Sequence, residues 1–269
     1  LNAMEWADSV GVDIIHSSLG YSLFDSLQGD YSYQDMDGKS TLITIAAERA
    51  AERGIFITNS AGNSGNDPWF YITAPCDGKN VLCIGAVDSF RTVTEFSSRG
   101  PSADGRIKPD VTTMGSRNTI PNRNGILRRG SGTSFSGPLV AGLVACLKGA
   151  HPDKSNEQIF EAILLSSDRY DTPDNEYGHG IPDALGADSI LTAMPVLSIN
   201  KAEELDVTIY PNPARDYFQI RTEPGSQLQI TNLQGQVVIA KKLQNWVNFV
   251  NVKNLSRGTY VIRVMYEGS

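Results

Sequence analysis

The sequence predicts an α/β domain built on a parallel sheet, followed by a small all-β sandwich. Three observations lead to this: helical and strand-like segments alternate up to about residue 192, a polar stretch follows, and short alternating runs fill the remainder. Alternation of helices and strands is typical of parallel sheets, whereas closely spaced short strands are typical of sandwiches. We therefore expect one domain at residues 1–192, a linker at 193–204 and a second domain at 205–269.

The elements of the first domain can be placed in chain order. The predicted helices are 1–10, 41–53, 134–149 and 159–167, and the predicted strands are 12–19, 55–60 and 81–87. Gly11 and Gly54 act as helix stops, and Ser155 with Gln158 forms a capping box before the fourth helix. The helix at 134–149 is apolar nearly all round, which predicts burial. Residues 88–133 are expected to be rich in loops.

The second domain shows no helical spacing. Its short alternating runs are VTIY, YFQIRT, LQITN, QVVIA, WVNFVNV and TYVIRVMY, with Gly225, Gly235 and Gly258 between them. Residues 205–269 hold 7 basic and 4 acidic side chains, a net charge of +3, whereas 1–204 hold 16 and 26, a net charge of −10. The acidic balance therefore belongs to the first domain alone.

Composition excludes several classes of protein. The chain has 269 residues and a net charge of −7, and its pI near 5.0 argues against nucleic-acid binding, which needs clustered positive charge. The longest apolar run, Pro138–Leu147, is shorter than the roughly 18 residues that a membrane helix requires. Three cysteines are too few for a disulfide scaffold. We expect no nucleic-acid partner and no membrane span.

The first candidate for chemistry is Ser134, within Gly132-Thr-Ser-Phe-Ser-Gly-Pro138 at the start of an apolar helix. A serine in this place can simply cap the helix. The neighbouring glycines, however, allow close approach of a substrate, and a helix N-terminus supplies free N–H groups and positive potential where an oxyanion could form. A serine hydroxyl still needs a base beside it to act as a nucleophile.

Two further segments follow predicted strands. Asn63 lies in Asn59-Ser-Ala-Gly-Asn-Ser-Gly65, where Asn and Gly either make a turn or place an amide donor for an oxyanion. Ser18-Leu19-Gly20 closes the strand at 12–19 and, taken alone, is only a strand end.

Together and in this order, the three segments resemble those of the subtilases, the subtilisin-like serine peptidases. The segments at 95–111 (EFSSRGPSADGRIKPDV) and 177–184 (YGHGIPDA) resemble the same family. The resemblance implies a subtilisin-like sheet and a secreted serine endopeptidase that forms an acyl-enzyme on Ser134, with Asn63 in the oxyanion hole. It further implies that Ser18, Leu19, Gly20, Ala61 and Gly62 line the cleft for protein or peptide substrates.

The histidine and aspartate of a serine-peptidase triad have no counterpart here. His16, His151 and His179 each lie outside the family's His-Gly-Thr context, and no Asp-Thr-Gly segment is present. Because the subtilisin order is Asp, then His, then Ser, we expect both residues upstream of residue 1. The N-terminal half of the domain would then be missing, the strand at 12–18 would be an open edge, and this chain alone would be inactive. The alternative is a non-catalytic subtilase-like peptide-binding or surface scaffold protein.

The C-terminal block resembles the sorting domains of proteins that Gram-negative bacteria export by the type nine secretion system. The resemblance is carried by Tyr210-Pro-Asn-Pro-Ala214 and by Leu255-Ser-Arg-Gly-Thr-Tyr260. It implies that residues 205–269 contact secretion machinery and that the protein is secreted or displayed at the cell surface. A generic carbohydrate- or partner-binding sandwich is the alternative.

Cysteines and cofactors complete the expectations. Cys76 and Cys83 flank a turn and could pair, although free, buried thiols are expected, and Cys146 is expected to be a small buried hydrophobe. The chemistry requires no cofactor. Members of the family often hold structural calcium, but no segment resembles a calcium loop closely enough to name ligands, so no metal residue is assigned.

Overall fold

The computed structural model describes residues 2–24, 29–194, 207–233 and 235–266. The chain divides into two compact units, residues 1–197 and 198–269. The predicted linker at 193–204 lies for the most part outside the described residues.

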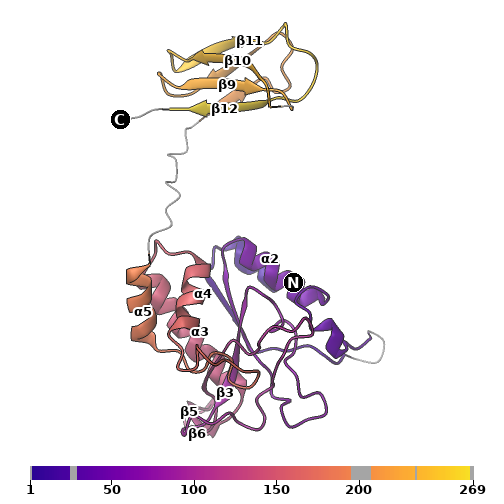
Figure 1. Ribbon diagram of the computed structural model, residues 1–269, viewed down its shortest axis with the longest axis vertical. Helices are drawn as coiled ribbons and strands as arrows, with labels where there is room; N and C mark the ends of the chain where they lie inside the picture. The colour runs from indigo at the N-terminus through magenta and orange to yellow at the C-terminus, as the bar shows by residue number, and fades with distance from the viewer. Residues whose placement is uncertain (1, 25–28, 195–206, 234, 267–269) are drawn as a thin grey trace. The chain divides into compact units, whose positions relative to one another are not determined.

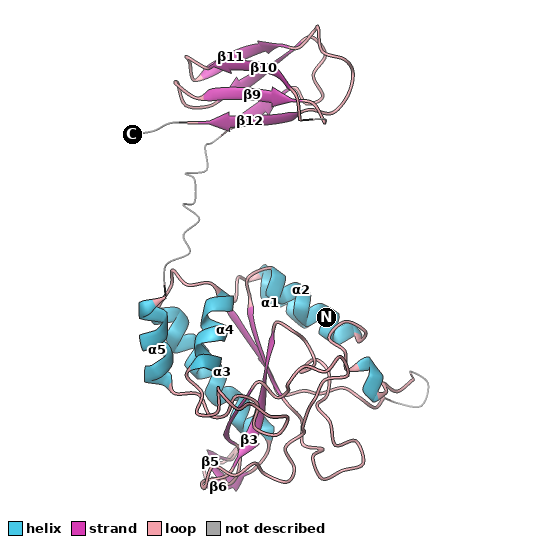
Figure 2. Cartoon of the chain, viewed as in Figure 1, coloured by secondary structure: helices cyan, strands magenta, loops and turns pink. Residues whose placement is uncertain are grey.

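A parallel four-stranded sheet forms the centre of the first unit (Figures 1 and 2). Its strands are β1 (Ile14–Ser17), β2 (Phe56–Ser60), β3 (Val81–Val87) and β4 (Val111–Met114), in the order β1-β2-β3-β4. All seven residues of β3 are buried, as expected for a strand covered on both faces. The predicted parallel sheet is confirmed, and β1 lies at one of its edges.

Helices cover both faces of this sheet. They are α1 (Asn2–Ser9), α2 (Leu42–Glu52), α3 (Thr133–Ala150), α4 (Asn156–Leu165) and α5 (Ala184–Ala193), with a short 3-10 turn at Tyr33–Asp35. Alternate strand residues point to opposite faces: Phe56 packs with α3, α4 and α5, whereas its neighbour Ile57 packs with α2. Figure 1 shows α3, α4 and α5 on the opposite side of the sheet from α2.

Local sequence signals explain where several helices begin. Thr41 caps α2 by accepting the Thr44 N–H, and Ser155 and Gln158 form the predicted capping box at α4. Gly11 and Gly54, the predicted stops, have φ of +74° and +90°. The predicted helix and strand positions in this part of the chain are therefore confirmed to within a few residues.

The loop-rich region contains more structure than expected. Besides β4, it holds an antiparallel pair, β5 (Asn118–Pro121) and β6 (Leu127–Gly130). The prediction that α3 is buried all round is wrong, because only one of its faces packs on the sheet. Leu139 on the outer face is 54% exposed, and Cys146 is exposed there rather than buried.

The second unit consists of two three-stranded antiparallel sheets, ordered β10-β9-β12 and β11-β8-β7. The strands are β7 (Thr208–Tyr210), β8 (Tyr217–Arg221), β9 (Gln227–Thr231), β10 (Val237–Lys242), β11 (Val247–Asn251) and β12 (Val261–Met265). Phe218 and Ile220 of β8 and Leu228 and Ile230 of β9 alternate inward and share one core. The predicted small all-β domain is confirmed.

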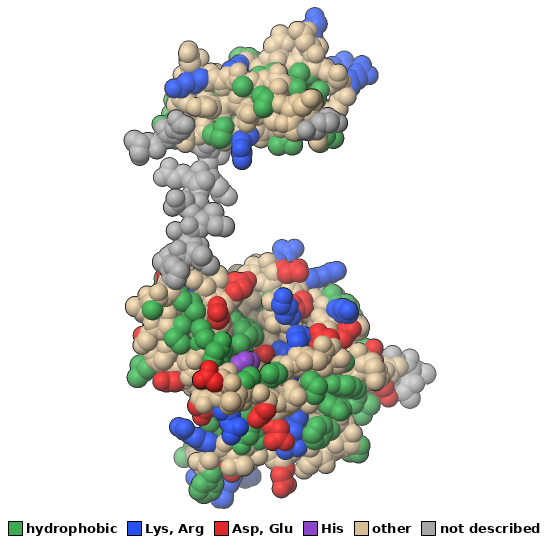
Figure 3. Space-filling model, in the orientation of Figure 1, with side chains coloured by type: hydrophobic (Ala, Val, Ile, Leu, Met, Phe, Trp, Pro, Cys, Tyr) green, Lys and Arg blue, Asp and Glu red, His purple; other side chains and the backbone are tan. Residues whose placement is uncertain are grey.

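Charged side chains are distributed differently on the two units. On the face visible in Figure 3, acidic and basic side chains are interspersed over the first unit, and Lys and Arg side chains project from the second.

No helix in the described part of the chain is both long and apolar enough to cross a bilayer.

Candidate active site

Three segments distant in sequence meet at the carboxyl edge of the sheet. Residues 18–20 follow β1, residues 61–63 follow β2, and Ser134 is the second residue of α3. The segments are joined by hydrogen bonds, including one from Ser60 Oγ to the Thr133 carbonyl at 2.9 Å. Because strands in a parallel sheet end at the same edge, two loops and one helix start can build a single site.

Asn63 is fixed by the residue that precedes the candidate nucleophile. Its Oδ1 accepts hydrogen bonds from the Thr133 backbone N–H at 2.8 Å and from Thr133 Oγ1 at 3.1 Å. These two bonds fix which end of the amide is the acceptor. The donor group Nδ2 makes no hydrogen bond to any residue that the structure describes, and the side chain is exposed. Asn63 therefore presents a free donor beside the start of α3.

Gly132 leaves a small space between two donors. A Cβ built on Gly132 would lie 3.4 Å from Asn63 Nδ2 and 3.8 Å from the Ser134 backbone nitrogen, and the residue has φ of +147°. The Ser134 N–H belongs to the first turn of α3, so it has no partner within the helix. A developing negative charge in this space would meet two hydrogen-bond donors and the positive end of the helix dipole.

The predicted cleft residues differ in accessibility. Ser18, Leu19 and Gly20 are exposed, Leu19 at 61%, and a methyl on Gly20 would collide with Thr73 Oγ1. Ala61 is fully buried, and both its N–H and its carbonyl bond within the protein, so it can contribute only from beneath the surface.

Gly62 is partly exposed with φ of +111°. Its N–H donates to Thr133 Oγ1 at 3.3 Å, and its carbonyl accepts the Ser98 N–H at 3.0 Å. The Ser98 hydroxyl also accepts the Ser64 N–H at 3.0 Å. Thr133 and Ser98 thus hold the loop on two sides. Both lie in segments that the sequence indicated, 132–138 and 95–111, but their supporting role was missed, because a hydroxyl that supports a loop from a distant segment has no local signature.

A disulfide lies beneath this loop. Cys76 and Cys83 are bonded, with 5.0 Å between their Cα atoms, and both pack with Ala61 and Ile72. The expectation that they are free thiols is wrong. The turn after Cys76 folds the chain back so that the Cys76 side chain faces Cys83, the third residue of β3. The spacing of the two cysteines alone did not reveal this turn.

Among the described residues, no histidine is hydrogen-bonded to Ser134. His16 Nδ1 and Nε2 lie 2.9 Å from Thr58 Oγ1 and 3.0 Å from Ser18 Oγ. His151 pairs with Asp188 at 2.8 Å at the far end of α3, and His179 Nδ1 lies 3.1 Å from the Asp110 carbonyl.

Two buried acids stabilise the segments behind the site. Lys108 Nζ lies 2.7 Å from Asp110 Oδ2, which also accepts the Cys83 N–H at 2.7 Å. Asp77 accepts from the Thr44 hydroxyl at 2.6 Å and from the Gly38 N–H at 2.8 Å. Burial raises the pKa of Asp77, although these hydrogen bonds and the Lys108 charge oppose the rise. From the sequence alone Asp77 is interpreted as an ordinary surface or turn acid, which its complete burial shows to be wrong, and no role is indicated for Asp110.

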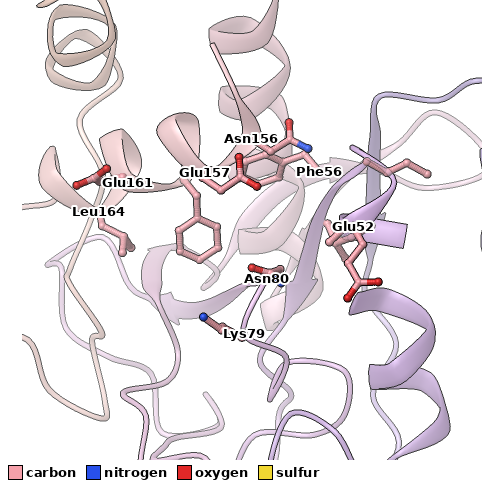
Figure 4. Close-up of a pocket in the computed structure, with 12 residues that line it drawn as sticks. Glu52, Phe56, Lys79, Asn80, Asn156, Glu157, Glu161 and Leu164 are labelled. Atoms are coloured by element: carbon pink, nitrogen blue, oxygen red, sulfur yellow. The ribbon is translucent and has the colours of Figure 1, made fainter. Parts of the chain in front are cut away.

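A separate cavity of about 370 Å³ lies at the opposite edge of the sheet, where β2 and β3 begin. Figure 4 shows Phe56 and Leu164 lining it, with Glu52, Lys79, Glu157 and Glu161 also around it. The residues that line the cavity include neither Ser134 nor Asn63. Among the described residues, no three His, Cys, Asp or Glu side chains gather as metal ligands, so the expectation of structural calcium gains no ligand set.

Comparisons with known proteins match each of the two units to a protein family. A family model described as "Subtilase family" matches residues 1–180, and one described as "Secretion system C-terminal sorting domain" matches residues 208–269. Serine protease AprX of Bacillus subtilis is 32% identical over 195 residues, which are 64% of this chain and 42% of AprX. Subtilisin E of the same organism is 29% identical, over 67% of this chain and 42% of its own length. The chain thus spans less than half of these relatives.

Solved structures share the fold of the first unit. The prenylagaramide maturation protease PagA is 25% identical with a TM-score of 0.55, over 72% of this chain and 67% of that one. The PatG macrocyclase in complex with peptide is 20% identical with a TM-score of 0.57, over 72% and 56% of the two chains.

Proposed function

The chain belongs to the subtilase family, and on that premise we propose that it is the nucleophile-bearing part of a secreted serine endopeptidase. Ser134 is the nucleophile, and Asn63 Nδ2 with the Ser134 N–H forms the oxyanion hole. Residues 208–269 are a sorting domain that directs export through the type nine secretion system to the cell surface or the extracellular space. Residues 205–269 contact the secretion machinery.

One observation carries the assignment of the site. The space beside Gly132 lies 3.4 Å from Asn63 Nδ2 and 3.8 Å from the Ser134 nitrogen, so two donors, one of them the N–H of the candidate nucleophile itself, flank one position. Attack of Ser134 Oγ on a peptide carbonyl turns its oxygen into an oxyanion, and these donors would stabilise that charge. Collapse of this intermediate expels the amine and leaves an acyl-enzyme on Ser134, which water then hydrolyses.

The general base and its aspartate come from outside residues 1–269. This part of the proposal is supported by the three histidines, because each has partners other than Ser134. Serine peptidases lose most of their rate when one triad member is absent, since the members act as a unit. The chain alone is therefore expected to be inactive. The chemistry needs no cofactor, and any calcium would be structural, with ligands still unassigned.

The substrate is an extended protein or peptide segment. Residues 18–20 and 61–63 follow the neighbouring parallel strands β1 and β2. An extended peptide can add its backbone at the exposed residues 18–20, while Leu19, which is 61% exposed, supplies an apolar contact.

Labelling with a fluorophosphonate tests the proposal. A longer form of the protein that includes the sequence preceding Leu1 is expected to be labelled at Ser134 and to cleave a denatured protein substrate. The 269-residue chain should do neither, and Ser134→Ala in the longer form is the matched control. Absence of labelling in a folded longer form would favour the non-catalytic scaffold. Cleavage by the 269-residue chain that Ser134→Ala abolishes would instead refute the external base.

A further inference from the structure

The imidazole of His16 packs beneath the first turn of α3. A methyl group on Gly137 would collide with His16 Cε1 and with Ser60 Oγ, so ring and helix are in close contact. Both ring nitrogens lie beside hydroxyls, with Thr58 Oγ1 2.9 Å from Nδ1 and Ser18 Oγ 3.0 Å from Nε2. His16 is therefore coupled to side chains of the site without contacting the nucleophile.

A chain of hydroxyls leads from this ring to the nucleophile segment. Ser18 Oγ lies 3.4 Å from Ser60 Oγ, and Ser60 Oγ donates to the Thr133 carbonyl at 2.9 Å. Thr133 directly precedes Ser134, and its N–H is the group that Asn63 Oδ1 accepts. The Thr133 carbonyl, at the end of the chain, belongs to the peptide that supplies the Ser134 N–H, and Asn63 binds the N–H of the preceding peptide.

The proton positions along this chain follow from its partners. The Thr58 hydroxyl donates to the Ile15 carbonyl at 3.4 Å, so Nδ1 of a neutral His16 carries the ring proton and donates to Thr58 Oγ1. Nε2 then accepts from the Ser18 hydroxyl. Since Ser60 donates to Thr133, no proton lies between Ser18 and Ser60, and the chain is interrupted there.

A second proton on the His16 ring would allow a hydrogen bond between Ser18 and Ser60, where the chain is interrupted. Nε2 would become a donor to Ser18 Oγ, and the Ser18 hydroxyl would be free to turn toward Ser60 Oγ. The groups facing the ring are Thr58 and Ser60 from β2, Ser18 after β1 and Gly137 from α3, none of them charged. Burial lowers the pKa of His16 from its ordinary value, so the neutral ring predominates near neutrality.

We propose that His16 is a positioning residue for the nucleophile segment. The Thr133 carbonyl accepts from Ser60 Oγ at 2.9 Å and from Ser136 Oγ at 3.0 Å. Protonation of His16 allows Ser60 Oγ also to accept from Ser18, which strengthens the Ser60–Thr133 hydrogen bond and thereby adjusts the peptide between Thr133 and Ser134. The meaning of this coupling for catalysis rests on the proposed function, but the coupling itself is a property of the folded chain.

NMR of the 269-residue chain tests the coupling without any enzymatic activity. Between about pH 8 and pH 4 the His16 ring should titrate, and the amide signals of Thr133 and Ser134 should shift with the same midpoint. His151, at the other end of α3 and paired with Asp188, is the internal control. His151→Gln should leave the shifts of Thr133 and Ser134 unchanged.

Two variants separate positioning from a merely structural role. Ser60→Ala interrupts the chain, so His16 should still titrate while the shifts at Thr133 and Ser134 are lost. His16→Asn should displace the Thr133 and Ser134 signals at neutral pH and abolish their pH dependence. The proposal is overturned if His16 titrates and these two amides do not follow. It is equally overturned if His16 stays neutral throughout and His16→Asn leaves both amides in place. These NMR results are independent of fluorophosphonate labelling. The proposal for His16 and the proposed function can therefore fail separately.

Discussion

Replacing Lys108 by methionine should strongly destabilise the first unit. Lys108 Nζ donates to Asp110 Oδ2 at 2.7 Å and to the Val81 carbonyl at 3.0 Å, and the two charged side chains are only 2% and 11% exposed. Methionine retains an unbranched apolar stem but removes both hydrogen bonds and the positive charge. The Asp110 carboxylate would then remain buried without its counter-charge.

The magnitude follows from this burial. Removing one partner of a buried ion pair costs about 3–5 kcal/mol, whereas an exposed pair contributes about 0–1 kcal/mol. Since whole domains are stable by about 5–15 kcal/mol, Lys108→Met should remove about a fifth or more of the free energy of unfolding. Asp110→Asn in addition should restore at least about 1 kcal/mol, because the asparagine Oδ1 can still accept the Cys83 N–H while the unpaired charge is gone.

Urea unfolding monitored by tryptophan fluorescence measures the free energy of unfolding of each variant. A Trp246→Phe background removes the one tryptophan of the second unit and leaves Trp6 and Trp69 in the first. Lys79→Met, at an exposed position, is the matched control and should lie within about 0.5 kcal/mol of the parent. The reasoning is refuted if Lys108→Met is as mild as this control, or if the double variant is no more stable than Lys108→Met alone.

Three further predictions address the site and its supports. In the longer, active form, Gly132→Ala should lower kcat/KM by roughly 100-fold or more, because the methyl enters the space between the oxyanion donors; an unchanged rate of fluorophosphonate labelling at Ser134 would contradict this. Replacing Cys76 and Cys83 by alanine should cost about 2.4 kcal/mol from the lost seven-residue loop constraint, and urea midpoints with and without reductant should show no reductant effect in the variant. Burial raises the folded pKa of Asp77 above its unfolded value, so the stability that Asp77 contributes is present below about pH 3.8 and is lost as the pH rises through the folded pKa. The free energy of unfolding of Asp77→Asn, relative to that of the parent, should therefore rise between about pH 4 and about pH 7, and a relative stability that falls over this range would show the sign to be wrong.

The sequence was informative wherever the signal is local. The buried strand at 81–87, the capping box at Ser155 and the alternating runs after residue 205 each reflect neighbours along the chain, and all are present. The segments around Ser134 and Asn63 were found for the same reason, because each is contiguous.

The remainder depends on contacts between distant residues. β4 has only four residues and is stabilised by pairing with β3, so it shows no periodicity of its own. The bond from Thr133 to Asn63 spans 70 positions, and the disulfide required a turn whose closure composition did not reveal. The prediction of a buried α3 failed because small and apolar residues do not by themselves indicate which face is covered.

Cys146 provides an exposed thiol for chemical modification on the outer face of α3. Of the three cysteines in the sequence, two are joined to each other, which leaves one exposed thiol on α3, the helix whose second residue is Ser134. A maleimide should therefore attach at a single site, at a rate set by thiolate content and access. Comparing the rate of modification at Cys146 in the 269-residue chain with the rate at the same residue in a longer form would measure how much of this face additional sequence covers.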